Sequence, residues 1–266
     1  MERLGPVARA ALLALLSCCG GSSQAEPAAD AGAAASSSDA SADAASPTFC
    51  TTSNADFCAD FDRGATPGAD FDGVGVAGGG SLELIDAVAS SRPKALRSTL
   101  PALAAAAPPA SAQVEKRLSL PPGKRVITID VAARFGGPAG AGNPLVRVIA
   151  LGLGTGSIGL FRNGETWFVA VHRDNAGADE DEEPALASGP PLDTWSKLRL
   201  EVVLGRPGNI RIEIDGQEKL SRSIATHGDA QPLADAALVL GLSRVSGELA
   251  GMSADFDDAT VRLAAP

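Results

Sequence analysis

Apolar and polar residues alternate with a period of two in several stretches after residue 50. In the segment 126–135 the large apolar residues fall on one side, and polar or small residues fall on the other. The segments 197–204 and 210–215 alternate in the same way. Such alternation is typical of antiparallel strands with one buried face. The segment 145–153 is apolar on both sides, as expected of a strand in the middle of a sheet.

Turn-forming residues separate these stretches. They occur at residues 121–123, 163–164, 207–209 and 215–216. Proline, glycine, asparagine and aspartate at such positions favour tight turns between strands. No stretch after residue 50 has a long helical period. We therefore predict an all-β fold, an antiparallel sandwich of ten or more strands.

Short motifs resemble those of the concanavalin A-like and laminin-G-like jelly-roll domains. Thr194-Trp195 opens one strand, and after a short turn a second strand ends in Asp215-Gly216. The segment 57–62 resembles the opening strand of many such domains, and 256–261 resembles the closing strand. The resemblance implies that the two terminal strands pair. One jelly-roll sandwich is therefore expected to span residues 49–266.

Residues 1–17 have the pattern of a signal peptide. Arg3 and Arg9 flank a short apolar stretch, which is too short to cross a bilayer as a helix. The segment 15–18 resembles the lipobox of bacterial lipoproteins, which implies that Cys18 is acylated and becomes the mature N-terminus. An ordinary secretory signal is the alternative. Both interpretations predict export, and acylation predicts a lipid anchor at the outer membrane or cell surface.

The segment 18–48 is composed almost entirely of alanine, serine, aspartate, glycine and proline. A segment with so few large apolar side chains is predicted to be a disordered linker. Beyond it, Cys50 and Cys58 are spaced for a disulfide in an oxidising compartment. Cys19 has no assigned role.

The charge of the chain excludes one class of partner. The formal net charge is -10 and the pI is about 4.7, without a cluster of basic residues. Nucleic acid binding requires such a cluster, so no nucleic acid partner is expected. The same charge disfavours an acidic polysaccharide unless a local basic patch offsets it.

The most specific catalytic pattern involves Glu213, Asp215 and Glu218. Their spacing matches that of laminarinase-type glycoside hydrolases, which share the jelly-roll fold. Retaining hydrolysis needs two carboxyl groups about 5 Å apart. However, Asp215-Gly216 predicts a hairpin turn that would move Glu218 to the next strand. We therefore predict that the domain has no catalytic residues and is not an enzyme.

Two further residues are candidates for ligand binding. If Trp167 points into the core, then Phe168 and His172 lie on the opposite face of their strand, where they could line a binding site. The alternative for His172 is a surface residue without a role.

A structural calcium ion is implied by the resemblance. Asp60 and Asp62 would approach Asp257 and Asp258 if the terminal strands pair. Calcium binds six to eight oxygen ligands, which such carboxylates could supply. Solvated acids at strand ends are the alternative.

Together these patterns predict an exported, lipid-anchored protein with a non-catalytic, lectin-like sandwich that binds a glycan or another extracellular polymer. Two alternatives stay open. One is a structural or protein-interaction module without a small ligand. The other is a glycoside hydrolase or lyase of the laminarinase-like jelly-roll type.

Overall fold

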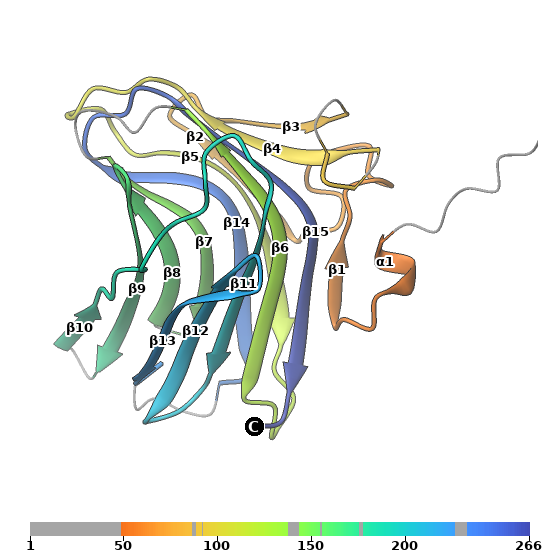
Figure 1. Ribbon diagram of the computed structural model, residues 1–266, viewed down its shortest axis with the longest axis vertical. Coiled ribbons are helices and arrows are strands. Elements are labelled where there is room, and N and C mark those ends of the chain that lie inside the picture. The colour runs from red at the N-terminus through yellow and green to blue at the C-terminus, as the bar shows by residue number, and fades with distance from the viewer. Residues whose placement is uncertain are drawn as a thin grey trace, which may run out of the picture. The chain divides into compact units, whose positions relative to one another are not determined.

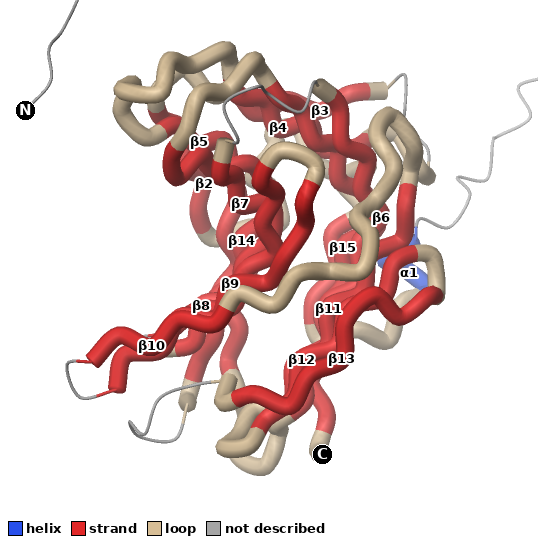
Figure 2. The backbone as a smooth tube through the Cα atoms, turned by 60° about the vertical axis from the view of Figure 1, so that its left-hand side comes forward, coloured by secondary structure: helices blue, strands red, loops and turns tan. Residues whose placement is uncertain are grey.

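The computed structural model describes residues 49–266, apart from residues 87–88, 92, 138–143, 155, 176–177 and 227–232. Within this part of the chain, two antiparallel sheets form a sandwich (Figure 1). Figure 2 shows the two layers, with β8, β9 and β10 on one side and β11, β12 and β13 on the other. The prediction of an all-β jelly-roll sandwich is confirmed.

Eight of the described strands form the first sheet, called sheet A. In spatial order they are β13 (Gln217–Ile224), β12 (Gly208–Ile214), β11 (Ser196–Val203), β6 (Val126–Gly136), β15 (Met252–Ala264), β4 (Ala95–Leu100) and β3 (Ser81–Ile85). The short strand β1 (Phe57–Ala59) pairs with the second half of β15. The only helix of the described residues, α1 (Phe49–Thr52), precedes β1.

The remaining seven described strands form sheet B. In spatial order they are β10 (Ala178–Glu182), β9 (Thr166–Asn175), β8 (Gly156–Asn163), β7 (Leu145–Leu153), β14 (Asp235–Ser246), β5 (Ala110–Ser119) and β2 (Gly73–Ala77). The apolar segment 145–153 is therefore a central strand, as its sequence predicts. No helix of the described residues is long and apolar enough to cross a membrane.

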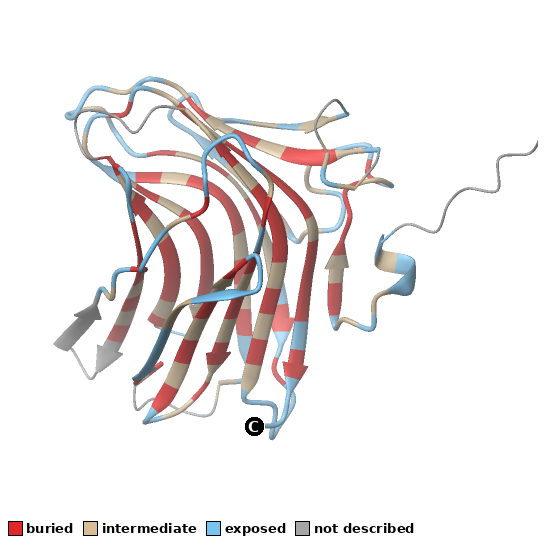
Figure 3. Ribbon diagram, viewed as in Figure 1, coloured by how far each residue is buried: buried red, intermediate tan, exposed pale blue. Residues whose placement is uncertain are grey.

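The alternating pattern of the sequence explains which faces meet. In β12 every second residue is buried, and Figure 3 shows the same alternation along many strands. The inward faces of both sheets form one core, in which the ring of Phe135 contacts Trp167 and Phe256 at centroid distances of 4.8 and 6.3 Å. Burying such large side chains is the main favourable contribution to folding.

The turn at Asp215 and Gly216 follows the sequence prediction. Asp215 and Gly216 join β12 to β13 with φ angles of 52° and 75°. Two successive positive φ values are the signature of the two-residue hairpin turn that aspartate and glycine favour. The turn carries the chain back along β12, as the sequence predicts.

The terminal strands pair, in agreement with the resemblance. Phe57 lies opposite Val261, and Ala59 lies opposite Ala259. Cys50 and Cys58 form a disulfide, which ties α1 to β1 and confirms that prediction. The segment before β1 is thereby held beside the outer face of sheet A.

Arg244 holds the loop that joins β4 to β5. Its guanidinium is almost fully buried and donates hydrogen bonds to the carbonyl oxygens of Ala104, Ala105, Ala107 and Pro108, at 2.9 to 3.1 Å. Its Nε also donates to the carbonyl oxygen of Gly247, three residues further along the chain. A loop rich in alanine and proline offers few side chains for packing, so one arginine fixes it through its backbone.

Candidate functional site

The outer face of sheet B carries a row of four side chains. Arg147 on β7 pairs with Phe161 on β8, which pairs with Phe168 on β9. Directly paired residues share a face of the sheet. Gln113 on β5 joins the same row, because Arg147 Nη2 donates a hydrogen bond to Gln113 Oε1 at 3.2 Å. We call Gln113, Arg147, Phe161 and Phe168 the sheet B row.

Arg147 differs from the arginines on sheet A. Arg97 and Arg199 each donate to an aspartate at 2.6 to 2.7 Å. Burial lowers the pKa of the Arg147 guanidinium, and no acidic side chain acts against this shift. In the described part of the chain Arg147 is therefore a partly desolvated cation without a carboxylate. Such a group favours an anionic ligand.

Gln113 adds neutral donors beside this cation. Its Oε1 accepts from Arg147, so its amide N–H groups are left to donate elsewhere. Gly75 on β2 makes space for this side chain, since a Cβ atom there would lie 3.3 Å from Gln113 Cγ. Gly241, opposite Gln113 on β14, places no side chain between Gln113 and Arg147. Guanidinium and amide together present N–H donors, a set suited to a carboxylate.

The other half of the row is aromatic. The rings of Phe161 and Phe168 are stacked, with centroids 5.6 Å apart and planes 14° apart. The Phe161 ring occupies the space that a side chain at Gly159 would fill, since a Cβ atom there would lie 2.5 Å from it. Phe168 is only 8% exposed, so half-buried Phe161 is the ring more open to a ligand.

The structure places the two predicted ligand-binding residues on this face. Trp167 is buried in the core, and Phe168 and His172 point away from it. His172 lies opposite Ser157, four residues beyond Phe168 along β9. That is about 13 Å along the strand, so a ligand that reaches both is a chain and not a single sugar.

The sequence analysis missed Arg147 and Gln113. Arg147 is the one charged residue in the apolar strand β7, and that position was its signal. The pairing with Gln113 depends on the order of strands in sheet B and could not be derived from the pattern.

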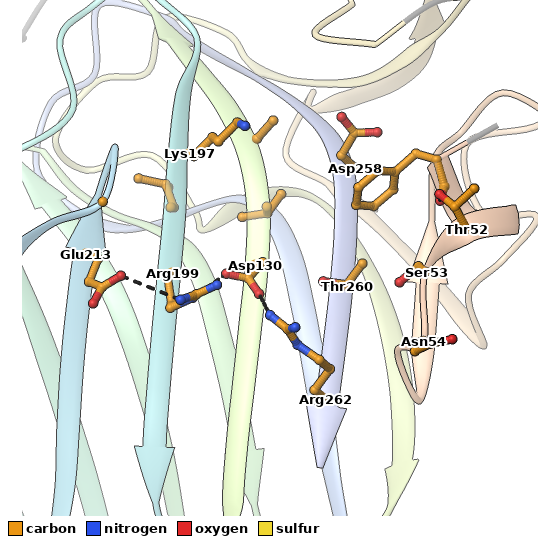
Figure 4. Close-up of a pocket in the computed structure, with 15 residues that line it drawn as sticks. Thr52, Ser53, Asn54, Asp130, Lys197, Arg199, Glu213, Asp258, Thr260 and Arg262 are labelled. Carbon is orange, nitrogen blue, oxygen red and sulfur yellow. Dashed lines mark hydrogen bonds and ion pairs between the residues drawn. The ribbon is translucent and has the colours of Figure 1, made fainter. Parts of the chain in front are cut away.

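A pocket of about 620 Å³ lies on the outer face of sheet A, beside α1 and the residues that follow it. Figure 4 shows a row of charged side chains across its floor, on β12, β11, β6 and β15: Glu213, Arg199, Asp130 and Arg262. Asp130 accepts from both arginines, and Arg199 Nη1 lies 3.7 Å from Glu213. The charges of this row are therefore paired with one another.

The carboxylates of the hydrolase-like motif lie at the edge of sheet A. The two-residue turn moves Glu218 to β13 and places it directly opposite Glu213, and the bulge in the pairing lies beyond these two residues. Arg211 binds both, at 2.7 Å to Glu213 and 2.9 Å to Glu218. Asp215 accepts a hydrogen bond from the backbone N–H of Lys197. With Arg211 between the two glutamates and Asp215 engaged in the turn, the geometry is that of structural ion pairs.

The four predicted calcium ligands lie near one another. Like-charge repulsion contributes to raised pKa values of Asp62, Asp257 and Asp258, after the larger effect of burial. Their oxygens accept protein hydrogen bonds: Asp257 binds Ser91 and the backbone N–H of residue 258. Asp60 likewise accepts from the backbone N–H groups of residues 50 and 62.

Among the described residues, no group of three or more histidine, cysteine, aspartate or glutamate side chains is arranged to hold a metal ion. These carboxylates therefore do not fit the calcium site that the resemblance implies. Cys18, the signal peptide 1–17 and the linker 18–48 lie outside the described residues.

Comparison with known proteins identifies the fold. No protein-family model and no curated protein sequence matches the chain. A solved endo-β-1,4-glucuronan lyase from the fungus Trichoderma reesei is similar at a TM-score of 0.61, with 14% identity over 79% of this chain and 96% of that chain. A cellulose-induced protein has a TM-score of 0.49 at 12% identity, covering 70% of this chain and 87% of its own. An alginate lyase has a TM-score of 0.48 at 13% identity, covering 77% of this chain and 96% of its own.

The prediction that the domain is not an enzyme is contradicted by this comparison. The solved structure with a TM-score of 0.61 is a lyase, so this fold carries polysaccharide cleavage in at least one protein. The sequence argument failed because it tested one hydrolase motif, at residues 213–218 in sheet A, and named no candidate site residue in sheet B other than Phe168 and His172.

Proposed function

We propose that this protein acts on a uronate-containing polysaccharide, which it binds across the outer face of sheet B. The observation that carries the proposal is Arg147, a half-buried guanidinium to which no described carboxylate is bound. A uronate carboxylate would supply the missing negative charge. Arg147 and Gln113 would both donate to it, and charge-assisted hydrogen bonds of this kind are the strong ones.

The aromatic half of the row supports a sugar ligand. Phe161 lies directly beside Arg147, on the next strand. A sugar ring can pack its apolar face on Phe161 while its carboxylate reaches Arg147, because neighbouring strands are about 5 Å apart. His172, farther along the same face, would contact a neighbouring part of the polymer.

The local charge outweighs the overall charge in this proposal. The chain has a net charge of -10, which disfavours an acidic polymer at long range. At contact distance the guanidinium of Arg147, which has no carboxylate partner among the described residues, determines the attraction for an acidic ligand. Salt screens the exposed charges of the chain beyond about 10 Å, but it screens a partly buried group much less.

Cleavage by β-elimination is the reaction class that the Arg147–Gln113 pair favours, and the similarity to a glucuronan lyase supports it. In such a step the proton at C5 is removed, the bond between C4 and the glycosidic oxygen breaks, and a C4–C5 double bond forms. The leaving oxygen takes up a proton, and no water is consumed. Donors on the carboxylate stabilise the negative charge that develops beside it.

We also propose that the protein is exported and lipid-anchored through Cys18. The disulfide Cys50–Cys58 supports export, because such bonds persist in oxidising compartments. Metabolic labelling with a fatty acid tests the anchor. Wild-type protein is expected to incorporate label and Cys18→Ser to lose it; equal labelling would contradict the proposal.

The experiment for the activity uses the folded chain with three sets of oligosaccharides: oligoglucuronate, oligoalginate and a neutral β-glucan series. Calorimetry measures binding, and ultraviolet absorbance of the new double bond measures cleavage. We expect binding of at least one acidic set, with absorbance rising as it is cleaved. The absence of binding to both acidic sets would overturn the proposed function. Binding without any rise in absorbance would overturn the lyase reaction alone.

A further inference from the structure

The pocket on sheet A is separate from the sheet B row and is enclosed by a different part of the chain. Its floor is the outer face of β12, β11, β6 and β15, and its wall is the segment 49–54. A volume of about 620 Å³ is within the range of small-molecule sites, which is roughly 300 to 1,000 Å³. We propose that this pocket is a second binding site, and that its ligand is an uncharged saccharide.

The wall of the pocket is held in place by covalent and hydrogen bonds. The disulfide from Cys50 to Cys58 fixes α1 to β1, and β1 pairs with β15. The backbone N–H of Cys50 also donates to Asp60. A wall fixed in this way loses little conformational entropy when a ligand binds, which favours affinity.

The charges of the pocket favour an uncharged ligand. Its lining contains three cations and three carboxylates: Lys197, Arg199 and Arg262 against Asp130, Glu213 and Asp258. Asp130 accepts from both arginines, so an incoming anion would compete with an existing pair. A ligand with a net charge therefore has little electrostatic advantage, unlike a ligand at Arg147.

Hydroxyl and amide groups make the remaining polar surface. Thr52, Ser53 and Asn54 lie on the wall, and Thr260 lies on β15 opposite them (Figure 4). Thr52 Oγ1 donates to a backbone carbonyl and Ser53 Oγ accepts a backbone N–H, so each hydroxyl keeps further capacity. Asn54 and Thr260 have no side-chain hydrogen-bond partner within the described part of the chain. Asn54 is exposed, so its amide is open to a ligand, whereas Thr260 is almost fully buried at the floor of the pocket.

Phe49 adds an aromatic ring to the polar lining of the pocket. Its ring is 39% exposed and belongs to the pocket lining. One aromatic ring beside several hydroxyl, amide and ion-paired groups matches the two sides of a sugar, which has an apolar face and a rim of hydroxyls. A fully apolar ligand would leave these polar groups without partners at a cost in free energy.

Calorimetric titration of the full chain with cellotriose, maltotriose, xylotriose and mannotriose tests this site. We expect at least one of these neutral probes to bind, and we expect Phe49→Ala and Asn54→Ala each to weaken that binding about tenfold or more. Val245→Ala is the matched control, because it removes an exposed apolar side chain on β14 and should leave binding unchanged. The probes are uncharged, so the result does not depend on whether sheet B binds an acidic polymer.

Two outcomes would overturn the site. One is that none of the four neutral probes binds. The other is that a probe binds equally well to the wild type, Phe49→Ala and Asn54→Ala. A preference of the pocket for oligoglucuronate, seen as loss of its binding in both pocket variants, would overturn the assignment to an uncharged ligand. Thermal unfolding of each variant shows whether it is folded, and Asn54→Ala changes only an exposed side chain.

Discussion

Arg147 on β7 donates a hydrogen bond to Gln113 on β5, and the whole strand β14 lies between them. The bond therefore spans two strand spacings over one face of sheet B. Gly241 lies opposite Gln113, so no side chain from that position interrupts it. Two residues 34 positions apart in the sequence thus form one group of donors.

Replacement of Arg147 by alanine should remove most of the affinity for an acidic polysaccharide. A charge-assisted hydrogen bond contributes about 1.5–3 kcal/mol, which corresponds to a loss of roughly 10- to 100-fold. Calorimetric titration with oligoglucuronate at two salt concentrations measures this loss of affinity. The affinity of the variant should also depend less on the salt concentration than that of the wild type. Arg222→Ala, which removes an exposed cation on β13, is the control. An Arg147→Ala variant that binds as tightly as wild type would rule out the assigned role.

Replacement of Arg244 by alanine should destabilise the domain. The change removes the donor to the carbonyl oxygens of residues 104–108 and leaves an empty space where the almost fully buried side chain was. Each carbonyl oxygen that water does not reach then costs about 1–3 kcal/mol. We expect a loss of about 3–5 kcal/mol in the free energy of unfolding, measured by urea denaturation. Arg117→Ala removes a side chain that is 79% exposed and should cost under about 0.5 kcal/mol. Equal midpoints for the two variants would show that the loop does not depend on Arg244.

Asp257 should make the domain less stable as the pH rises. Burial is the main cause that raises its pKa to about 7 from 3.8, with the charge of Asp258 adding to the shift. The folded protein then binds the proton more tightly than the unfolded chain does. The stability from this group is complete below about pH 4 and is lost as the pH rises through about 7.

Unfolding free energies measured from pH 4 to pH 8 test this expectation. The wild type should lose stability over the interval by an amount on the order of 4 kcal/mol at most, and Asp257→Asn should show a flatter profile. The pKa values of Asp62 and Asp258 are raised as well, so the variant should keep part of the slope. Identical slopes for variant and wild type would contradict the assignment to Asp257.

Calcium should have little effect on the domain. The oxygens of Asp60 and Asp257 already accept hydrogen bonds from backbone N–H groups, and a metal ion would have to displace them. We expect Tm to be the same with calcium and with a chelator. A rise of several degrees on addition of calcium would instead show that these carboxylates rearrange around the ion.

The sequence predicts the fold far better than the site. Alternation in segments such as 126–135 depends only on one buried face per strand, so it is visible without any knowledge of neighbours. The turn at Asp215-Gly216 and the disulfide Cys50–Cys58 each join residues that are close in the sequence, so both could be predicted in the same way. The strand order of sheet B is not local, because β14 enters between β5 and β7 from more than 80 residues further along the chain.

The site depends on that strand order. Arg147 and Gln113 belong to segments that the pattern treats separately, and only the position of β14 between their strands makes them partners. Phe168 and His172 could be placed on the outward face, because one strand is enough to decide which way they point. The pocket on sheet A was not foreseen, since it needs α1 to be tied beside β15.

The disulfide between Cys50 and Cys58 has a mechanical consequence. Any pull on the chain that precedes Phe49 passes through the sulfur bridge directly to Cys58, in the middle of β1. Residues 51–57 are thereby removed from the path of the force. The tension is delivered to the pairing of β1 with β15, within sheet A, and residues 51–54 of the pocket wall are shielded from it. A force applied ahead of the disulfide therefore loads the pairing of β1 with β15 before it loads residues 51–54 of the pocket wall.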